Sequence, residues 1–323
     1  MSAPSRMIRL PGGRFRMGSN AFYPEESPEH VADVAPFDLD RHPVTNAQFA
    51  VFVSATGYLT VAERALDPGD FPGVPVEDLV PGALVFTPTS GPVDLGNWRQ
   101  WWAWAPGAHW RHPFGPDSDL TGKDEHPVVH VAFEDATAYA TWAGKRLATE
   151  EEWEFAARGG RTDATPFAWG TEPRPGDRLM ANTWQGRFPY LNAGADGWVG
   201  TSPVGSFPAN PYGFSDLIGN VWEWTSSYYT SRHEAAATAA TTNPLALASV
   251  PEQPCSCGCS PADEGRRARS MEPGSRIPRR ALKGGSHLCA PEYCLRYRPA
   301  ARSPQADDTA TTHIGFRCAR DAG

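Results

Sequence analysis

The sequence predicts a loop-rich globular fold held together by large aromatic side chains, and three observations support this prediction. Gly and Pro number 31 and 32 among 323 residues, well above their usual combined share of about 12%. Twelve tryptophans accompany them. Hydrophobic residues make up 40% of the chain and charged residues 20%, which is ordinary for a globular protein. A helical bundle and a regular parallel α/β sheet are therefore both disfavoured.

Strand and helix signals open the chain after a frayed N-terminus. The alternating residues 14–18 predict a strand, and residues 31–34 with 37–40 predict a second. Thr45, followed three positions later by a glutamine, matches a capping box that opens a helix. Gly57 is the expected end of that helix.

The middle of the chain alternates irregular and regular segments. Residues 63–125 are rich in Pro, Gly and Trp and predict a long irregular stretch. Residues 126–131 predict a short strand, and residues 134–143 a helix. Thr149 is the predicted cap of another helix, which Gly159 ends.

Residues 231–280 differ in composition from the rest and predict a mostly flexible surface insertion. They contain Cys255, Cys257 and Cys259 in a C-x-C-x-C pattern. We interpret these thiols as adventitious, and copper delivery by this loop is the alternative.

Length and charge narrow the classes of function. A chain of this length can bury a sizeable core as one large domain or two. The net charge of −8 gives no support to binding of nucleic acid or an anionic membrane. There is no run of 18 apolar residues and no apolar N-terminal signal region, so we expect neither a membrane span nor secretion. The expectation is a cytoplasmic monomer with reduced cysteines.

Two cysteines lie five positions apart near the end of the chain, in Lys283-Gly-Gly-Ser-His-Leu-Cys289-Ala-Pro-Glu-Tyr-Cys294. A fully extended chain would separate their Cα atoms by roughly 16 Å, so they act together only if the step folds back. Pro291 fits a turn there. Nearby cations lower a thiol pKa and favour the reactive thiolate. Such cations are Lys283, His287, Arg296, Arg298 and Arg302.

Spacing alone leaves three interpretations of this pair open. It slightly favours a disulfide that closes a short loop, while a redox pair and a two-thiolate site for a soft metal are the alternatives. Structural zinc usually needs four ligands, and the chain has no C-x₂-C pair to supply them. Two thiolates suit a low-coordinate Cu(I) ion. The cytoplasmic expectation disfavours the disulfide.

Two oxygen-rich segments, residues 182–198 and 212–224, precede the insertion. Each offers carboxylate and amide oxygens, with glycines that turn backbone carbonyls inward, and calcium takes six to eight such oxygens. Neither matches an EF-hand loop. Asx turns without an ion are an equally good interpretation.

Five segments in one order make the chain recognisable. They are His126-Pro-Val-Val-His-Val131, Thr141-Trp-Ala-Gly-Lys-Arg-Leu-Ala-Thr-Glu-Glu-Glu-Trp-Glu154, the stretch from Gly213 to Trp224, Lys283-Gly-Gly-Ser286 and Gly315-Phe-Arg-Cys-Ala319. In this combination the chain resembles the formylglycine-generating enzyme (sulfatase-modifying factor) family of the bacterial type. The scaffold motifs are shared with a wider superfamily. The pattern Ser286-x-x-Cys289-x₄-Cys294 resembles that of the active enzymes, because inactive paralogues lack the cysteine pair.

The resemblance implies an α+β fold, a single loop-rich domain related to C-type lectins with little regular secondary structure. The domain would span residues 7–320, with the insertion at about 231–280 and tails at 1–6 and 321–323. The implied reaction consumes O2 and converts the cysteine of a Cys-x-Pro-x-Arg motif in unfolded sulfatases to Cα-formylglycine, which activates them.

The resemblance also implies cofactors and site residues. Cu(I) would be held by Cys289 and Cys294, and structural Ca²⁺ would bind elsewhere. Ser286 and Tyr293 would form hydrogen bonds in the pocket, and Trp222 would form an apolar wall. Arg302 would bind a substrate carbonyl or stabilise thiolate charge, although packing and a salt bridge are equal alternatives for Trp222 and Arg302. The two implied calcium sets are Asn182, Thr183, Asp196 and Trp198, and Asp216, Gly219, Val221 and Glu223.

Departures from the family pattern qualify the resemblance. Ala140, Ala156 and Pro299 occupy positions that form disulfides in secretory members, so Cys318 is expected to be an unpaired, buried core residue. His313 stands where an asparagine is common, and its polar role is not transferred.

The rival functions are a non-catalytic lectin-like binding module, a metal-free thiol redox protein and an iron sulfoxide synthase. The last needs a histidine triad and an extra N-terminal domain, which we do not expect here.

Overall fold

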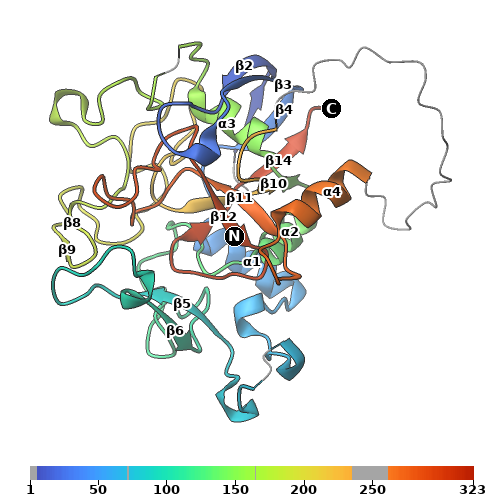
Figure 1. Ribbon diagram of the computed structural model, residues 1–323, viewed down its shortest axis with the longest axis vertical. Coiled ribbons are helices and arrows are strands. Elements are labelled where there is room, and N and C mark those ends of the chain that lie inside the picture. Colours follow the sequence, from blue (N-terminus) through green and yellow to red (C-terminus); the bar gives the residue numbers. More distant parts are fainter. Residues whose placement is uncertain (1–5, 71–72, 164, 235–260) are drawn as a thin grey trace.

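The computed structural model describes residues 6–70, 73–163, 165–234 and 261–323. Two four-stranded sheets lie near the centre of the molecule, and long loops surround them (Figure 1). The first sheet has the order β1–β4–β14–β7 and is antiparallel throughout. Its strands are β1 (Met7–Leu10), β4 (Phe37–Asp40), β14 (Cys318–Asp321) and β7 (Arg146–Leu147).

The second sheet carries the cysteine segment. Its order is β12–β11–β10–β13, antiparallel except for the parallel pair β10–β13. Lys283, the last residue of β11, lies opposite Arg302, the first residue of β12. The connection between them, residues 284–301, contains both cysteines. The strands are β12 (Arg302–Ala306), β11 (Arg279–Lys283), β10 (Trp222–Tyr228) and β13 (Ile314–Gly315).

Three two-stranded ribbons complete the described strands. The ribbon β5–β6 lies inside the stretch that we predicted to be irregular. The ribbons pair β2 (Gly13–Met17) with β3 (His30–Val34), β5 (Gly82–Phe86) with β6 (Trp102–Pro106), and β8 (Gly186–Arg187) with β9 (Leu191–Asn192).

The helices follow their sequence signals closely. Thr45 caps α1, where its side chain accepts a hydrogen bond from the Gln48 N–H, and Gly57 ends the helix in the left-handed region. Thr149 and Gly159 do the same for α3. The predicted helix at residues 134–143 is also present. The helices are α1 (Asn46–Thr56), α2 (Phe133–Trp142), α3 (Glu150–Arg158) and α4 (Pro261–Ser270).

Two strand predictions need correction, and an edge strand was missed. Residues 126–131 are not a strand; Pro127 forms an isolated bridge with Thr45, and the segment is buried through packing. Residues 31–34 and 37–40 lie in two separate strands of different sheets, β3 and β4. The edge strand β1 was not predicted, because its partner β4 lies about 30 positions along the chain.

The C-x-C-x-C cluster of Cys255, Cys257 and Cys259 lies outside the described residues. At the described end of the predicted insertion, α4 and the start of β11 form regular structure. Over the described ranges, no helix has both the length and the apolar character needed to cross a membrane.

A large core holds the two central sheets and α1, α2 and α3 together. Phe49 of α1 packs edge-on against Trp110, with ring centroids 5.1 Å apart. Trp153 of α3 and Trp224 of β10 are fully buried. Cys318 is buried and unpaired in this core, as predicted. A second, smaller cluster surrounds the cysteine loop and contains Phe86, Trp101, Trp184, Phe188, Leu288 and Ala290.

Candidate active site

The loop between β11 and β12 begins with two glycines that the backbone requires. Gly284 and Gly285 have φ angles of +95° and +71°, which residues with a side chain rarely adopt. A Cβ at Gly284 would lie 2.7 Å from the Leu217 carbonyl oxygen. This close approach seats the start of the loop against the preceding Asp216–Leu217 segment and fixes where Ser286 and Cys289 enter the site.

The five-residue step between the cysteines folds back, as the sequence required. The backbone N–H groups of Tyr293 and Cys294 both donate to the Ala290 carbonyl, at 3.0 and 2.7 Å. The two sulfur atoms come to 3.2 Å from each other. Cys289 is 2% exposed and Cys294 8%. A disulfide would place the sulfurs at about 2.05 Å, so these are free thiols and the disulfide that spacing slightly favoured is not formed.

The pKa values of the two thiols are shifted in opposite directions. A hydrogen bond from Cys289 and the nearby Arg296 guanidinium outweigh burial and lower the pKa of Cys294 to about 7. Burial, followed by the neighbouring Cys294 sulfur, raises the pKa of Cys289. The pair is therefore poised with Cys294 as the thiolate and Cys289 as the donor of a hydrogen bond. The Ser286 backbone N–H adds a weak contact to the Cys289 sulfur at 3.4 Å.

A cavity of about 410 Å³ opens onto the thiol pair. Five of the six residues predicted for catalysis line it: Ser286, Cys289, Tyr293, Cys294 and Trp222. They come from the cysteine loop and from the first residue of β10. Tyr293 stacks on Phe188 with ring centroids 4.3 Å apart, so one wall of the cavity is aromatic and rigid.

The sixth predicted residue, Arg302, has a different position. It is 1% exposed, does not line the cavity, and donates to the Glu150 carboxylate at 2.7 Å. The salt-bridge alternative is thus the arrangement found. The physical reason is register: Arg302 lies opposite Lys283, and Glu150 of α3 balances both cations.

Several residues of the cavity wall were not predicted as site residues. His313 lies with its Nδ1 3.3 Å from the Ser286 hydroxyl, and burial lowers its pKa to about 3, so the ring is neutral. Arg296, which the sequence showed only as a nearby cation, also lines the cavity. Trp102 and Phe188 complete the apolar wall. The family position of His313 was the one signal that could have found it.

The first predicted calcium set contains a feature that fits a cation. One carboxylate oxygen of Asp196 accepts from the Trp198 N–H at 3.0 Å, while the other is buried without a hydrogen-bond partner. Burial raises the pKa of Asp196. The carbonyl and hydroxyl oxygens of Thr183 accept hydrogen bonds from Gln185, and the Asn182 amide donates to Gly200. A cation would satisfy the unpartnered Asp196 oxygen.

The second predicted calcium set fits a cation poorly. Both oxygens of Glu223 accept hydrogen bonds from the buried Arg317 guanidinium, at 2.7 Å each, and the Trp153 indole donates to one of them. Asp216 accepts from the Gly205 N–H, and burial raises its pKa to about 6. Glu223 therefore already balances a buried cation, and Gly219 and Val221 add only backbone to this set.

The fold and the site together define a class: a loop-rich α+β domain in which a pair of free thiols lines a cavity. Comparison with known sequences then gives the family. The sulfatase-modifying factor enzyme 1-like domain matches residues 2–322. The formylglycine-generating enzyme of Mycobacterium tuberculosis is 60% identical over 317 residues, which cover 98% of each chain. The chain therefore belongs to the formylglycine-generating enzyme family.

More distant relatives give the range of that family. The formylglycine-generating enzyme of Streptomyces coelicolor is 44% identical over 98% of this chain and 89% of its own. A Bos taurus relative described as an inactive Cα-formylglycine-generating enzyme 2 is 37% identical over 98% of this chain and 88% of its own. Overall similarity alone thus does not separate active from inactive members, and the site has to carry that distinction.

Solved structures confirm the predicted fold class. The structure of PvdO from Pseudomonas aeruginosa superposes with a TM-score of 0.59 at 23% identity, over 98% of this chain and 94% of that one. The crystal structure of CarF gives a TM-score of 0.54 at 17% identity, over 99% of both chains. At these identities the likeness concerns the fold alone.

Proposed function

We propose that this protein is a formylglycine-generating enzyme that uses Cu(I) and O2 to oxidise the cysteine of a Cys-x-Pro-x-Arg motif in unfolded sulfatases. The observation that carries the proposal is the thiol pair, with 3.2 Å between its sulfurs, in the wall of a cavity. The relatives at 60% and 44% identity bear the name of this activity. The cysteine pair supports placing this chain with the active members.

The donor set suits a soft, monovalent metal. Cys289 and Cys294 offer two buried sulfurs, which suit a soft ion such as Cu(I), whereas a structural zinc ion usually needs four ligands. No third His, Cys, Asp or Glu side chain of the described residues joins them as a ligand, which leaves space for a sulfur of the substrate. A bound Cu(I) ion would supply the one-electron chemistry that lets a thiolate react with O2.

The overall reaction has to balance its electrons. Oxidation of the substrate cysteine to a thioaldehyde releases two electrons and two protons, and water then converts the thioaldehyde to the aldehyde with loss of hydrogen sulfide. Reduction of O2 to water takes four electrons. An external thiol reductant must therefore supply the other two.

The chain's own residues position the substrate and exclude water. Burial raises the pKa of Tyr293, so its phenol stays protonated and can donate a hydrogen bond. Ser286 offers a hydroxyl beside the neutral His313 ring. Trp222 and Phe188 line the cavity with apolar surface, which favours O2 and disfavours water near the sulfurs.

A peptide assay tests this function directly. Purified protein loaded with Cu(I) is incubated in air with a thiol reductant and a Cys-x-Pro-x-Arg peptide, and the peptide mass is read. We expect conversion to the aldehyde by the wild type and none by Cys289→Ala or Cys294→Ala. Absence of product from the wild type, or equal product from the cysteine variants, would exclude the proposal. The same peptide bound without turnover would instead support a binding module.

Calcium at the first set is a separate part of the proposal, supported by the unpartnered Asp196 oxygen. A chelator of Ca²⁺ should lower the melting temperature of the wild type and leave that of Asp196→Asn nearly unchanged, because the variant lacks the ligand charge. Equal shifts in both proteins would remove calcium from this position.

Residence as a cytoplasmic monomer also belongs to the proposal, and the three free thiols of the described residues agree with a reducing compartment.

A further inference from the structure

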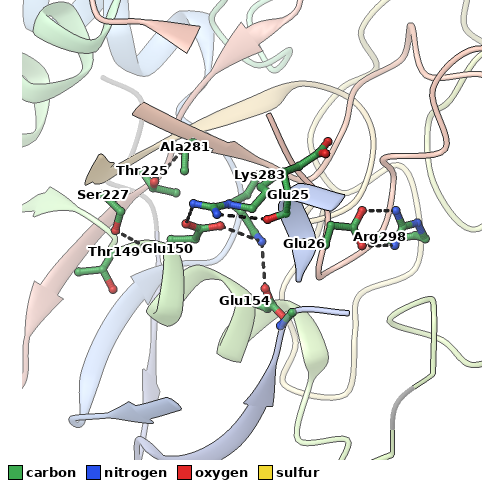
Figure 2. Close-up of polar contacts among 12 residues, drawn as sticks. Glu25, Glu26, Thr149, Glu150, Glu154, Thr225, Ser227, Ala281, Lys283 and Arg298 are labelled. Carbon is green, nitrogen blue, oxygen red and sulfur yellow. Dashed lines mark hydrogen bonds and ion pairs between the residues drawn. The ribbon is translucent and has the colours of Figure 1, made fainter. Parts of the chain in front are cut away.

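Buried ion pairs hold both ends of the cysteine loop. At the stem, Lys283 lies 2.9 Å from Glu154 and 3.5 Å from Glu150, and Arg302 lies 2.7 Å from Glu150. Figure 2 shows Glu150 and Glu154 projecting from α3 toward Lys283. The proposed mechanism uses none of these charges. They fix the positions of the last residue of β11 and the first of β12.

A second set of contacts holds the half of the loop that follows Cys294. It comes from residues 22–26, which we call the latch and which include the 3₁₀ helix η1 (Pro24–Glu26). The Leu295 N–H donates to the Tyr23 hydroxyl at 3.0 Å. Arg298 pairs with Glu26 through both carboxylate oxygens, as Figure 2 shows. About 270 residues of sequence separate the latch from the loop that it contacts.

Glu25 makes the latch contact to a residue that lines the thiol cavity. Its Oε1 accepts from both Nε and Nη2 of Arg296, at 3.2 and 2.6 Å. The Tyr23 ring packs against the same guanidinium, whose carbon lies 4.0 Å from the ring centroid. Arg296 lines the same cavity as Cys289 and Cys294. Glu25 thus fixes a cation at the wall of the thiol cavity.

Glu26 provides an internal comparison, because it is the neighbouring carboxylate and makes a similar pair. Its partner Arg298 packs on the Phe22 ring and does not line the thiol cavity. The Glu26–Arg298 pair is also more deeply buried, with side chains 0% and 1% exposed against 14% and 26% for Glu25 and Arg296. Purely structural effects should therefore be larger at Glu26.

We propose that Glu25 is a positioning residue for the thiol site, which holds the Arg296 cation beside Cys294 so that it balances the net negative charge of the two thiolates with their bound metal. Two thiolates and one Cu(I) ion leave a net negative charge in a buried cavity, and buried charge needs a compensating partner. Mutation of a residue that contacts the metal ligands from outside commonly lowers metal affinity by about 10-fold or more. This inference rests on the proposed function through the copper ion.

The first test needs no copper. NMR of arginine Nε–Hε groups in the copper-free protein reports whether each guanidinium is held. We expect the Arg296 signal of Glu25→Gln to show fast side-chain exchange while Arg298 stays unchanged, and the reverse in Glu26→Gln. An Arg296 signal in Glu25→Gln identical to that of the wild type overturns the inference.

The second test measures Cu(I) affinity by competition with a chromogenic chelator. We expect affinity to fall about 10-fold in Glu25→Gln, to recover in Glu25→Asp, and to change less than two-fold in Glu26→Gln. Loss of affinity that follows the loss of melting temperature across the variants would show a merely structural role and overturn the inference. If Glu26→Gln does not fold, Phe22→Ala takes its place, because the Phe22 ring packs on the Arg298 guanidinium.

The two tests separate the inference from the proposed function. A wild type that binds no Cu(I) would refute the proposed cofactor, and the copper-free NMR result would still decide whether Glu25 holds Arg296. A wild type that converts the peptide, with unchanged copper affinity in Glu25→Gln, would refute the inference alone.

Discussion

At the scale of single residues, the stability of the fold depends on buried ion pairs in which each charge needs its partner. Glu223 and Arg317 are 0% and 1% exposed and joined by two hydrogen bonds of 2.7 Å. Arg317 also donates to the backbone oxygens of Arg41 and Ser215. A buried charge that loses its partner is strongly destabilising, because neither water nor another charge compensates it.

Glu223→Gln should therefore lower the free energy of unfolding by about 3–5 kcal/mol. The matched control is Glu134→Gln, which removes the half-exposed pair with Arg64 and should cost no more than about 1 kcal/mol. Urea unfolding monitored by tryptophan fluorescence gives both values. Equal effects for the two variants would contradict the importance of burial.

At this scale, sequence reasoning brought together residues that line one cavity where their contacts are local. The two thiols, Ser286 and Tyr293 could be selected from the cysteine stretch itself, because a turn of five residues keeps them together. Arg302 belongs to the same stretch, yet its side chain pairs with Glu150 of α3, whereas Ser303, the next residue of β12, lines the cavity. The latch residue Glu25 carried no local signal, since its contacts form only in the folded chain.

At the scale of elements, the β11–β12 connection depends on its first glycine. Gly284 combines a positive φ with a close approach, whereas Gly274 has a similar φ of +84° and nothing near its missing Cβ. The comparison separates backbone strain, which both share, from the clash with the Leu217 carbonyl.

Gly284→Ala should consequently destabilise the protein more than Gly274→Ala, which should cost about 1 kcal/mol from strain alone. We also expect Gly284→Ala to lose peptide conversion, because the loop that carries Ser286 and Cys289 must shift. Melting temperatures and the peptide assay check both statements. A fully active, equally stable Gly284→Ala protein would contradict the close packing at the loop entrance.

The helices α1, α2 and α3 were predicted from local signals, whereas α4 and several strands were missed. The capping residues Thr45 and Thr149 and the end signals Gly57 and Gly159 act within a few positions. Strands depend on partners elsewhere in the chain, so β1 was missed, and residues 126–131 were assigned a strand although they pair only at Pro127.

At the scale of the whole molecule, buried histidines make stability depend on pH. Burial lowers the pKa of His130 and of His233 to about 4. In the unfolded chain these histidines have their ordinary pKa of about 6.5. The unfolded chain therefore binds more protons than the folded chain between about pH 4 and 6.5. Stability contributed by these groups is full above pH 6.5 and is lost as the pH falls toward 4. Burial raises the pKa of Asp135 and of Asp216 to about 6, which acts in the opposite sense over part of this range.

A single variant isolates the histidine contribution. The φ of +57° at His130 suits asparagine, so His130→Asn removes the titrating group while keeping the backbone. Between pH 6.5 and 4, the free energy of unfolding should fall by up to about 3 kcal/mol less in the variant than in the wild type. Parallel pH profiles would show that His130 titrates normally in the folded protein.

The fold class of the whole molecule was predictable, but only through the resemblance. Composition indicated a loop-rich chain, and the ordered motifs supplied the α+β domain that the comparisons confirm. The second calcium set could not be tested by sequence, because the Arg317 partner of Glu223 comes from the far end of the chain.

The measurement that tests the central claim most directly is an anaerobic Cu(I) titration followed by peptide conversion in air. The wild type should bind one Cu(I) per chain and convert the peptide only when loaded. Cys289→Ala and Cys294→Ala should lose both properties. A copper-free wild type that converts the peptide, or cysteine variants that bind Cu(I) as tightly as the wild type, would contradict a two-thiolate copper centre at Cys289 and Cys294.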